Sequence, residues 1–259
     1  MRSLFRFLLW LMAMSILVYG GLNLTSYLHQ SSLSSNLNES LIHRAVLAVG
    51  QRQQESVQTE TGPQPGEASP ETAPISVDFT VLREINPDVV GWLYCEDTPI
   101  NLPLVRGKNN DVYLHRMIDG SWNPAGTLFL DYRNAGDFSH GNTIIYGHNM
   151  KDKSMFAVLP SYNDPEFYAQ HPVMWLLTPE QDYKVELVAG CLTSSDSAVY
   201  SFGQSQETVY QQVLSCMDRS TFQSGLQISQ EDRFVTLSTC SYEFEEARYI
   251  LLGRLISLA

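Results

Sequence analysis

The stretch 233-RFVTLSTC-240 is a run of strand-forming residues that ends in a cysteine. Eight positions after that cysteine, a second such run, 248-RYILL-252, begins with an arginine. A cysteine at the end of a strand is held by the sheet while its sulfur faces a cleft, and a fixed cation nearby stabilises a thiolate or the oxyanion formed after attack. The two runs therefore predict neighbouring strands that present the Cys240 thiol beside the Arg248 guanidinium.

A histidine far upstream supplies the base that such a site needs. The segment 142-NTIIYGHNM-150 is another run rich in β-branched residues, and it places His148 at the end of an expected strand. An adjacent histidine activates a cysteine nucleophile. Cys240, His148 and Arg248 together form a candidate nucleophilic site. His140 is the nearest alternative base.

These motifs resemble those of the sortases, the cysteine transpeptidases that attach proteins to the cell wall of Gram-positive bacteria. The sortase signature TLxTC is complete at 236-TLSTC-240, with the arginine on the next expected strand and the histidine far upstream. Four further stretches are similar to class B sortases in particular: 85-INPDVVGWL-93, 110-NDVYLHR-116, 126-GTLFLDYR-133, and 146-YGHNM-150 with Met155 and Phe156. The resemblance covers roughly residues 76–259 and does not extend to the first 75 residues.

The resemblance implies both a fold and a reaction. The fold is mainly β: a closed eight-stranded barrel, with an N-terminal helix and a helix in the loop before the strand of the catalytic cysteine. In the implied reaction Cys240 attacks the threonine carbonyl of a C-terminal sorting signal, and His148 protonates the leaving amine. Arg248 and backbone N–H groups bind the oxyanion, and Thr239 is expected near the peptide or the oxyanion. An amine then resolves the thioester acyl-enzyme.

The implied partners are secreted proteins that carry a C-terminal sorting signal, with either an NPQTN-like or an LPxTG-like pentapeptide. The amine comes from a peptidoglycan peptide or from its lipid-linked precursor. An alternative is a class B pilin-polymerising sortase, whose acceptor is a lysine of another protein subunit. A membrane-anchored cysteine protease is a second alternative, for which hydrolysis would not respond to added amines. A membrane-tethered binding domain without activity is disfavoured because the candidate catalytic residues are intact.

The N-terminus reads as a membrane anchor. Arg2 and Arg6 precede an apolar run that extends from residue 7 to Leu24, and about 18 apolar residues approach the lower limit for spanning a bilayer. No lysine or arginine follows until Arg44, so the positive-inside rule places the N-terminus in the cytoplasm and the remaining chain outside the cell membrane. A cleaved signal peptide is the competing interpretation, although it usually has a shorter apolar core.

Three segments follow from this pattern: an anchor at 1–25, a stalk helix with a flexible linker at 26–75, and the catalytic domain at 76–259. The stalk has apolar residues at roughly helical spacing, and residues 51–74 contain almost no large apolar side chain. A fragment from about residue 76 is therefore expected to fold alone. A short helix is expected over residues 77–85.

Short β-rich runs separated by turns dominate the chain after residue 91, which favours a closed or nearly closed sheet. The expected strands cover residues 126–130, 142–148, 173–177, 183–192, 233–239 and 248–255. Residues 207–217 carry a helical stripe of apolar side chains in the connection before the cysteine strand. Arg254, further along the last strand, is expected to be structural.

Composition excludes several other functions. The net charge is −12, so nucleic acid is an improbable partner, because phosphate binding needs clustered cations. No set of residues has metal-ligand spacing and no glycine-rich phosphate loop occurs, so no metal or cofactor is expected. A nucleophilic Cys240 must stay reduced, which leaves at most one disulfide. The other three cysteines, Cys95, Cys191 and Cys216, are expected to be free buried thiols.

Overall fold

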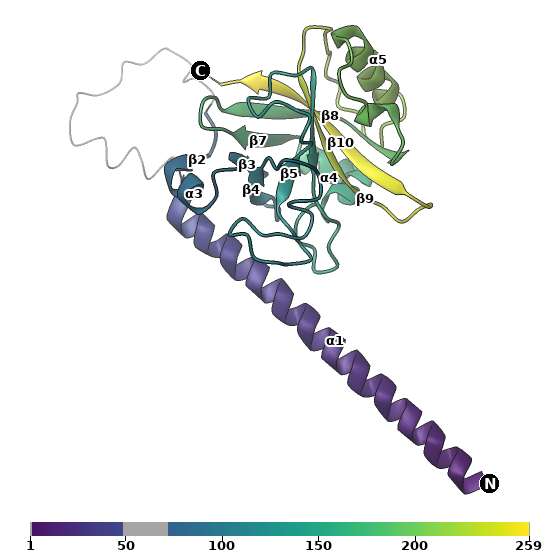
Figure 1. The fold of residues 1–259 in the computed structure, drawn as a ribbon. Helices are drawn as coiled ribbons and strands as arrows, with labels where there is room; N and C mark the ends of the chain where they lie inside the picture. The colour runs from purple at the N-terminus through teal and green to yellow at the C-terminus, as the bar shows by residue number, and fades with distance from the viewer. Residues whose placement is uncertain (1, 49–71, 259) are drawn as a thin grey trace.

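A closed eight-stranded barrel forms the centre of the computed structural model, which describes residues 2–48 and 72–258 (Figure 1). Around the barrel the strands follow the order β10-β8-β7-β3-β4-β5-β6-β9. Their bounds are β3 (Val89–Tyr94), β4 (Asn101–Val105), β5 (Leu128–Leu130), β6 (Asn142–Tyr146), β7 (Val173–Leu177), β8 (Tyr183–Ser194), β9 (Phe234–Cys240) and β10 (Ala247–Ser257). The predicted mainly β fold with a closed eight-stranded barrel and an N-terminal helix is confirmed.

Two strands, β3 and β4, were not expected from the sequence. Pro103 lies inside β4, and a proline is normally excluded from a strand interior because it cannot donate to the ladder. Gly91 lies inside β3 at a register shift, where a Cβ atom would come within 2.9 Å of the Leu177 carbonyl oxygen. Glycine is therefore required for close approach of β7, although it weakens the strand signal in the sequence.

The barrel interior is filled by side chains that alternate along the strands. On β9, Val235 and Leu237 belong to the main core, whereas Phe234 packs on the opposite face with Ile250 and Leu252 of β10. Helix α5 (Gln206–Met217) covers that opposite face, and its N-cap is Ser205. The predicted helix before the cysteine strand is therefore confirmed. It contributes two buried valines and Cys216 to the outer core.

A disulfide joins α5 to the barrel and corrects the prediction of free thiols. Cys191 on β8 and Cys216 on α5 are bonded, with their Cα atoms 6.3 Å apart. The two cysteines are separated by 25 positions, and only the packing of α5 across β8 brings them together. The expectation is wrong for this pair, whereas Cys95 is free and buried and Cys240 is free and partly exposed.

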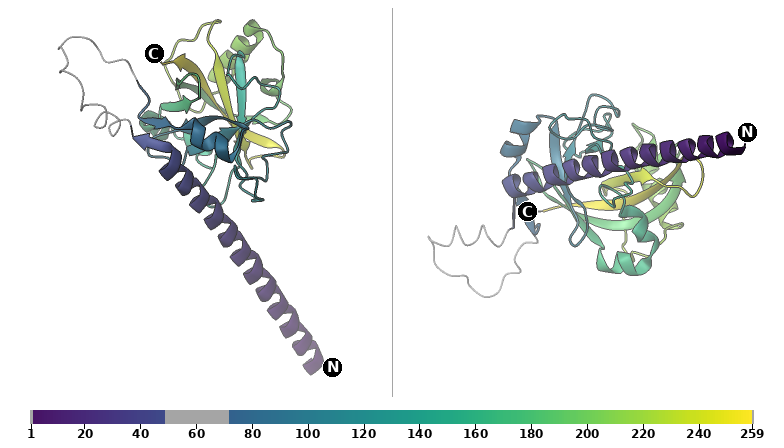
Figure 2. Two further views of the ribbon diagram at one scale, coloured as in Figure 1. Left: turned by 60° about the vertical axis from the view of Figure 1, so that its left-hand side comes forward. Right: turned by 90° about the horizontal axis from the view of Figure 1, so that it is seen from below.

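The N-terminal helix α1 (Arg2–Ala45) is a single uninterrupted helix of 44 residues, about 66 Å long at 1.5 Å per residue. Its C-terminal part lies along the barrel and its N-terminal part extends away from it (Figure 2). Leu41 and Ala45 are buried in a second core cluster with Trp92 and Phe129. The segment before residue 76 therefore contributes to the core, contrary to expectation, although the domain boundary itself stays a prediction.

The remaining elements connect α1 to the barrel and close its loops. Strand β1 (Val46–Ala48) pairs with β2 (Ile75–Val77), and α3 (Phe79–Ile85) follows, with its first turn capped by the Asp78 carboxylate. The expected helix over residues 77–85 thus begins two residues later. Short helices η1 (Leu159–Asn163), α4 (Pro165–Gln170) and η2 (Ala198–Tyr200) lie in the connections. Most of the predicted linker lies outside the described residues.

Candidate active site

The pairing of β9 with β10 places the thiol and the guanidinium side by side. Cys240 is the last residue of β9, Arg248 is the second residue of β10, and the two are direct partners in the antiparallel register. Directly opposite residues on antiparallel strands project to the same face of the sheet. The predicted pair of neighbouring strands is therefore present, with the two side chains on one face.

The parallel pairing of β6 with β9 brings the histidine to the same edge of the barrel. Tyr146, the last residue of β6, is in register with Ser238, and His148 follows two residues later. Parallel strands end at the same edge of a sheet, so residues that follow β6 lie beside the end of β9. One pocket of about 270 Å³ is lined by all three candidate residues. Its other lining residues are Asn110, Asp111, Leu114, Thr127, Phe129, Tyr146, Gly147, Ser238 and Thr239.

Two hydrogen bonds fix the end of β9 to the segment that carries His148. The Asn149 side-chain amide donates to the Cys240 carbonyl at 2.9 Å, and the Thr239 hydroxyl donates to the Gly147 carbonyl at 2.8 Å. Thr239 is buried, so its side chain is committed to this connection rather than to the pocket. A contact of Thr239 with the substrate or the oxyanion through its backbone stays a prediction.

His148 is held by one hydrogen bond and one ring contact. Its Nε2–H donates to the Leu114 carbonyl at 2.8 Å, so Nδ1 is the acceptor in the neutral ring. The ring stacks on His115, with centroids 5.5 Å apart and planes 12° apart. Burial lowers the pKa of His148 below its usual 6.5, the Leu114 carbonyl opposes that shift, and the nearby His115 adds to it. The neutral form is therefore favoured near neutral pH.

Arg248 keeps its guanidinium at the rim of the pocket. It donates to the Ala247 carbonyl at 3.0 Å and pairs with Glu246 at 3.2 Å. The Glu246 side chain is 66% exposed, and such surface ion pairs contribute little stability. Glu243 instead accepts from Ser241 and from the Tyr242 backbone. Of the acidic residues in this turn, Glu246 is thus the one paired with the candidate arginine.

His140 and Arg254 lie apart from these three residues. The His140 Nδ1 contacts the Asn134 amide at 3.1 Å, in a separate pocket of about 110 Å³. Arg254 forms ion pairs with Glu186 and Asp232, in agreement with its expected structural role. Neither residue lines the pocket that holds Cys240.

Sequence reasoning missed several residues around the pocket. Asn149 and His115 lie within the stretches that resemble class B sortases, so those stretches carried a signal that was not resolved to single residues. Tyr200 carried none: it lies 40 positions before Cys240, on η2, yet its hydroxyl is 2.7 Å from the Ser238 hydroxyl and its ring stacks on Tyr146. Among the residues that the structure describes, no group of three or more histidine, cysteine, aspartate or glutamate side chains is placed to hold a metal ion.

Comparisons with known proteins agree with this fold and site. The chain is 38% identical to sortase B of Listeria monocytogenes over 179 residues, which cover 68% of this chain and 73% of that protein. It is 30% identical to sortase B of Staphylococcus aureus over 184 residues, 70% of this chain and 75% of that protein. No family model matches the sequence.

Solved structures give the same result. The structure of a Staphylococcus aureus sortase B–substrate complex has a TM-score of 0.64 at 30% identity, and covers 70% of this chain and 85% of that chain. Sortase B from B. anthracis has a TM-score of 0.68 at 27% identity over 90% of this chain and 99% of that chain. Barrel, thiol site and relatives define an enzyme of the sortase class, a transpeptidase. Within that class, the chain belongs to the sortase B family.

Proposed function

We propose that Cys240 is the nucleophile, His148 the acid and base, and Arg248 the oxyanion-binding cation of a transpeptidase that acts on C-terminal sorting signals. The observation that carries this proposal is the register of Arg248 opposite Cys240 beside His148 in one pocket of about 270 Å³. A nucleophile, a base and an electrophilic stabiliser around one open space constitute the minimal site for acyl transfer.

The proposed reaction has two halves. The Cys240 thiol transfers its proton to His148, and the thiolate attacks the carbonyl carbon of the signal's threonine. Arg248 stabilises the tetrahedral oxyanion, which collapses as the leaving amine takes the proton from His148. An incoming amine then attacks the thioester, transfers its proton to His148 and expels the thiolate. The product is a new amide bond, and all three side chains return to their starting states.

The acceptor is proposed to be the amine of a peptidoglycan peptide or of its lipid-linked precursor. A solved structure of Staphylococcus aureus sortase B is a complex with triglycine, a peptide with a free amine, which supports this acceptor class. The net charge of −12 also favours a cationic amine over an anionic acceptor.

The enzyme is proposed to be anchored in the cell membrane by α1, with its N-terminus in the cytoplasm and its barrel on the outer face. The helix contains an 18-residue window with a mean hydropathy of 1.8, long and apolar enough to cross a bilayer. A secretory signal sequence has the same properties near an N-terminus. The two arginines before the apolar run support the stated orientation.

The test is trapping of the acyl-enzyme by mass spectrometry, with NPQTN-like and LPxTG-like peptides and with triglycine as the acceptor. We expect a thioester adduct on Cys240 and a triglycine-linked product. Cys240→Ala should form neither, whereas the matched control Cys95→Ala, at a buried site away from the pocket, should form both. Peptide hydrolysis that does not respond to triglycine would instead indicate a protease. An adduct on another residue would overturn the assignment.

A further inference from the structure

One face of α1 is packed on the barrel domain almost from the end of its apolar run. Side chains every three or four positions are partly or fully buried on this face, which we call the docking stripe: Tyr27, Gln30, Ser31, Ser34, Leu37, Asn38, Leu41 and Ala45. The apolar run ends at Leu24, only three residues before Tyr27, or about 4.5 Å along the helix. No break in α1 separates the two parts. The domain therefore has no flexible spacer between itself and the end of the apolar run.

Two loops of the barrel domain are tied to α1 at this level. The Asn123 amide donates to the Gln30 carbonyl at 2.8 Å, and the Ser31 hydroxyl donates to the Asp152 carboxylate at 2.6 Å. Gln30 lies six residues beyond Leu24, about 9 Å along the helix. These bonds place the ends of both loops near the height of the bilayer surface when the apolar run spans the hydrocarbon core.

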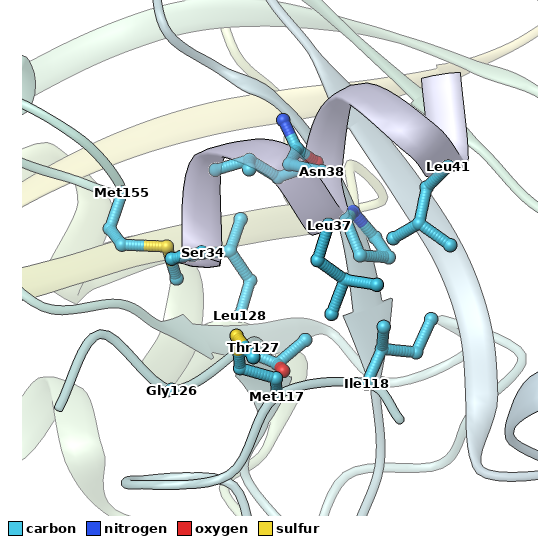
Figure 3. Close-up of a pocket in the computed structure, with 12 residues that line it drawn as sticks. Ser34, Leu37, Asn38, Leu41, Met117, Ile118, Gly126, Thr127, Leu128 and Met155 are labelled. Atoms are coloured by element: carbon cyan, nitrogen blue, oxygen red, sulfur yellow. The ribbon is translucent and has the colours of Figure 1, made fainter. Parts of the chain in front are cut away.

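Apolar packing holds the first loop against the docking stripe. Met117 and Ile118 line a small pocket together with Leu37 and Leu41 of α1, and Met155 closes one end of it (Figure 3). The pocket has room for about one water molecule, at about 30 Å³. Close packing of this kind fixes the loop's position relative to the helix rather than letting it swing freely.

The surface that these loops present has the chemistry of a membrane interface. Trp122, next to Asn123, is 64% exposed although it is the largest apolar side chain of its loop. Lys151 and Lys153 flank Asp152 and are also exposed. Tryptophan is enriched at the level of lipid headgroups, and lysines near the surface are attracted to anionic lipids. The headgroup region on each side of a bilayer is about 5 to 7 Å thick, comparable to the spacing along α1.

The same loop reaches the candidate base of the active site. The His115 ring lies between Trp122, at 6.4 Å, and His148, at 5.5 Å, measured between ring centroids. The histidine side of the pocket is thus two ring contacts from the exposed tryptophan. A substrate held in the bilayer surface would meet this side of the pocket first.

We propose that Trp122 and the lysines Lys151 and Lys153 form a contact surface for phospholipid headgroups, which holds the active-site pocket at the bilayer surface. This inference rests on the proposed membrane anchoring by α1. Both substrates of the proposed reaction are membrane-associated in that setting, because a sorting signal precedes an apolar segment and the amine precursor is lipid-linked. The contact surface then confines the enzyme and its substrates to one plane.

Tryptophan fluorescence of the full chain in vesicles tests this surface directly. The chain has four tryptophans, of which Trp10 lies in the apolar run and Trp92 is buried. In a Trp10→Phe background, phosphatidylcholine brominated near the headgroup end of its acyl chains, mixed with phosphatidylglycerol, should quench fluorescence. Adding Trp122→Phe should remove that quenching, whereas the matched control Trp175→Phe should leave it. Quenching that persists without Trp122, or none in the Trp10→Phe background, would overturn the proposed contact.

A seven-residue insertion between Thr25 and Ser26 provides an independent test. Seven residues add about 10.5 Å and nearly two whole turns, so the docking stripe keeps its rotational phase while the domain rises. The insertion should abolish lipid quenching and lower turnover of a vesicle-bound substrate, but leave turnover of a soluble peptide unchanged. Unchanged quenching in the inserted chain would also overturn the proposal.

Failures of the underlying proposals give different results. Release of the full chain from vesicles by alkaline carbonate would contradict the anchor and, with it, the headgroup contact. Loss of catalysis in all variants alongside normal Trp122-dependent quenching would contradict the proposed reaction while leaving the contact surface supported. Cys240→Ala should not change the quenching, because the thiol takes no part in the lipid contact.

Discussion

Arg248 lies opposite Cys240 on the neighbouring strand, and its guanidinium supplies both a charge and a planar pair of donors. Arg248→Lys keeps the charge but loses the fork, so acylation should slow about a hundredfold to a thousandfold, equivalent to about 2.7 to 4 kcal/mol. Single-turnover acylation measures this, and peptide binding should change much less because the oxyanion exists only near the transition state. The control is Arg254→Lys on the same strand. A rate for Arg248→Lys within about threefold of the parent would reduce its role to a diffuse charge.

The two candidate bases are distinguished by substitution. His148 lines the pocket with Cys240, whereas His140 lies in a separate pocket against Asn134. His148→Ala should abolish turnover and His140→Ala should keep most of it, measured by steady-state cleavage of a fluorogenic sorting peptide. Combining His148→Ala with Cys240→Ala should add no further loss, because either change already removes the covalent route. An active His148→Ala enzyme with a dead His140→Ala enzyme would reverse the assignment.

The protonation of His148 is expected to depend on its ring partner. Burial lowers its pKa below 6.5, and like charge on His115 lowers it further. The imidazolium should therefore form only below pH 6.5, and the midpoint should rise in His115→Gln because the like charge is gone. NMR titration of the His148 ring measures both values, with His171→Gln as a distant control. A midpoint above 6.5 in the parent, or no change in His115→Gln, would contradict the proposed electrostatics.

At the scale of elements, α5 is held to the barrel by the Cys191–Cys216 disulfide as well as by its buried valines. A crosslink that closes a loop of this length typically contributes about 3 kcal/mol, chiefly by restricting the unfolded chain. Replacing both cysteines by alanine should lower the free energy of unfolding by about that amount in urea titrations. Cys95→Ala, which breaks no crosslink, is the control. Equal stability of the double variant and the parent under oxidising conditions would show that α5 is held by packing alone.

At the scale of the whole molecule, the C-terminal part of α1 behaves as part of the domain. Leu41 is 2% exposed, and burial of one leucine side chain contributes about 1.5 to 3 kcal/mol. A fragment of residues 26–259 should therefore unfold at a temperature at least about 5 °C above that of a fragment of residues 76–259, given about 2 to 4 °C per kcal/mol for a domain of this size. Both fragments should fold. Equal melting temperatures in calorimetry would show that the docking stripe does not stabilise the domain.

Much of this protein could be predicted wherever local sequence decides structure. The β-branched runs predicted six of the eight barrel strands, the apolar stripe predicted α5, and the apolar run with two preceding arginines predicted the N-terminal helix. The TLxTC motif and its arginine predicted the sortase family and the placement of Cys240 beside Arg248. These features depend on side-chain periodicity and short-range pairing, which are written within a few consecutive residues.

Only the tertiary structure decided the contacts between residues far apart in the chain. The Cys191–Cys216 disulfide, the Tyr200–Ser238 hydrogen bond and the docking stripe on α1 all join segments whose own sequences give no sign of such contacts. Each depends on where barrel closure and helix packing bring two surfaces together. The sequence by itself determined the family and the reactive residues. The closed barrel determined which side chains surround them and how closely the domain is joined to its N-terminal helix, because those contacts exist only after distant strands have paired.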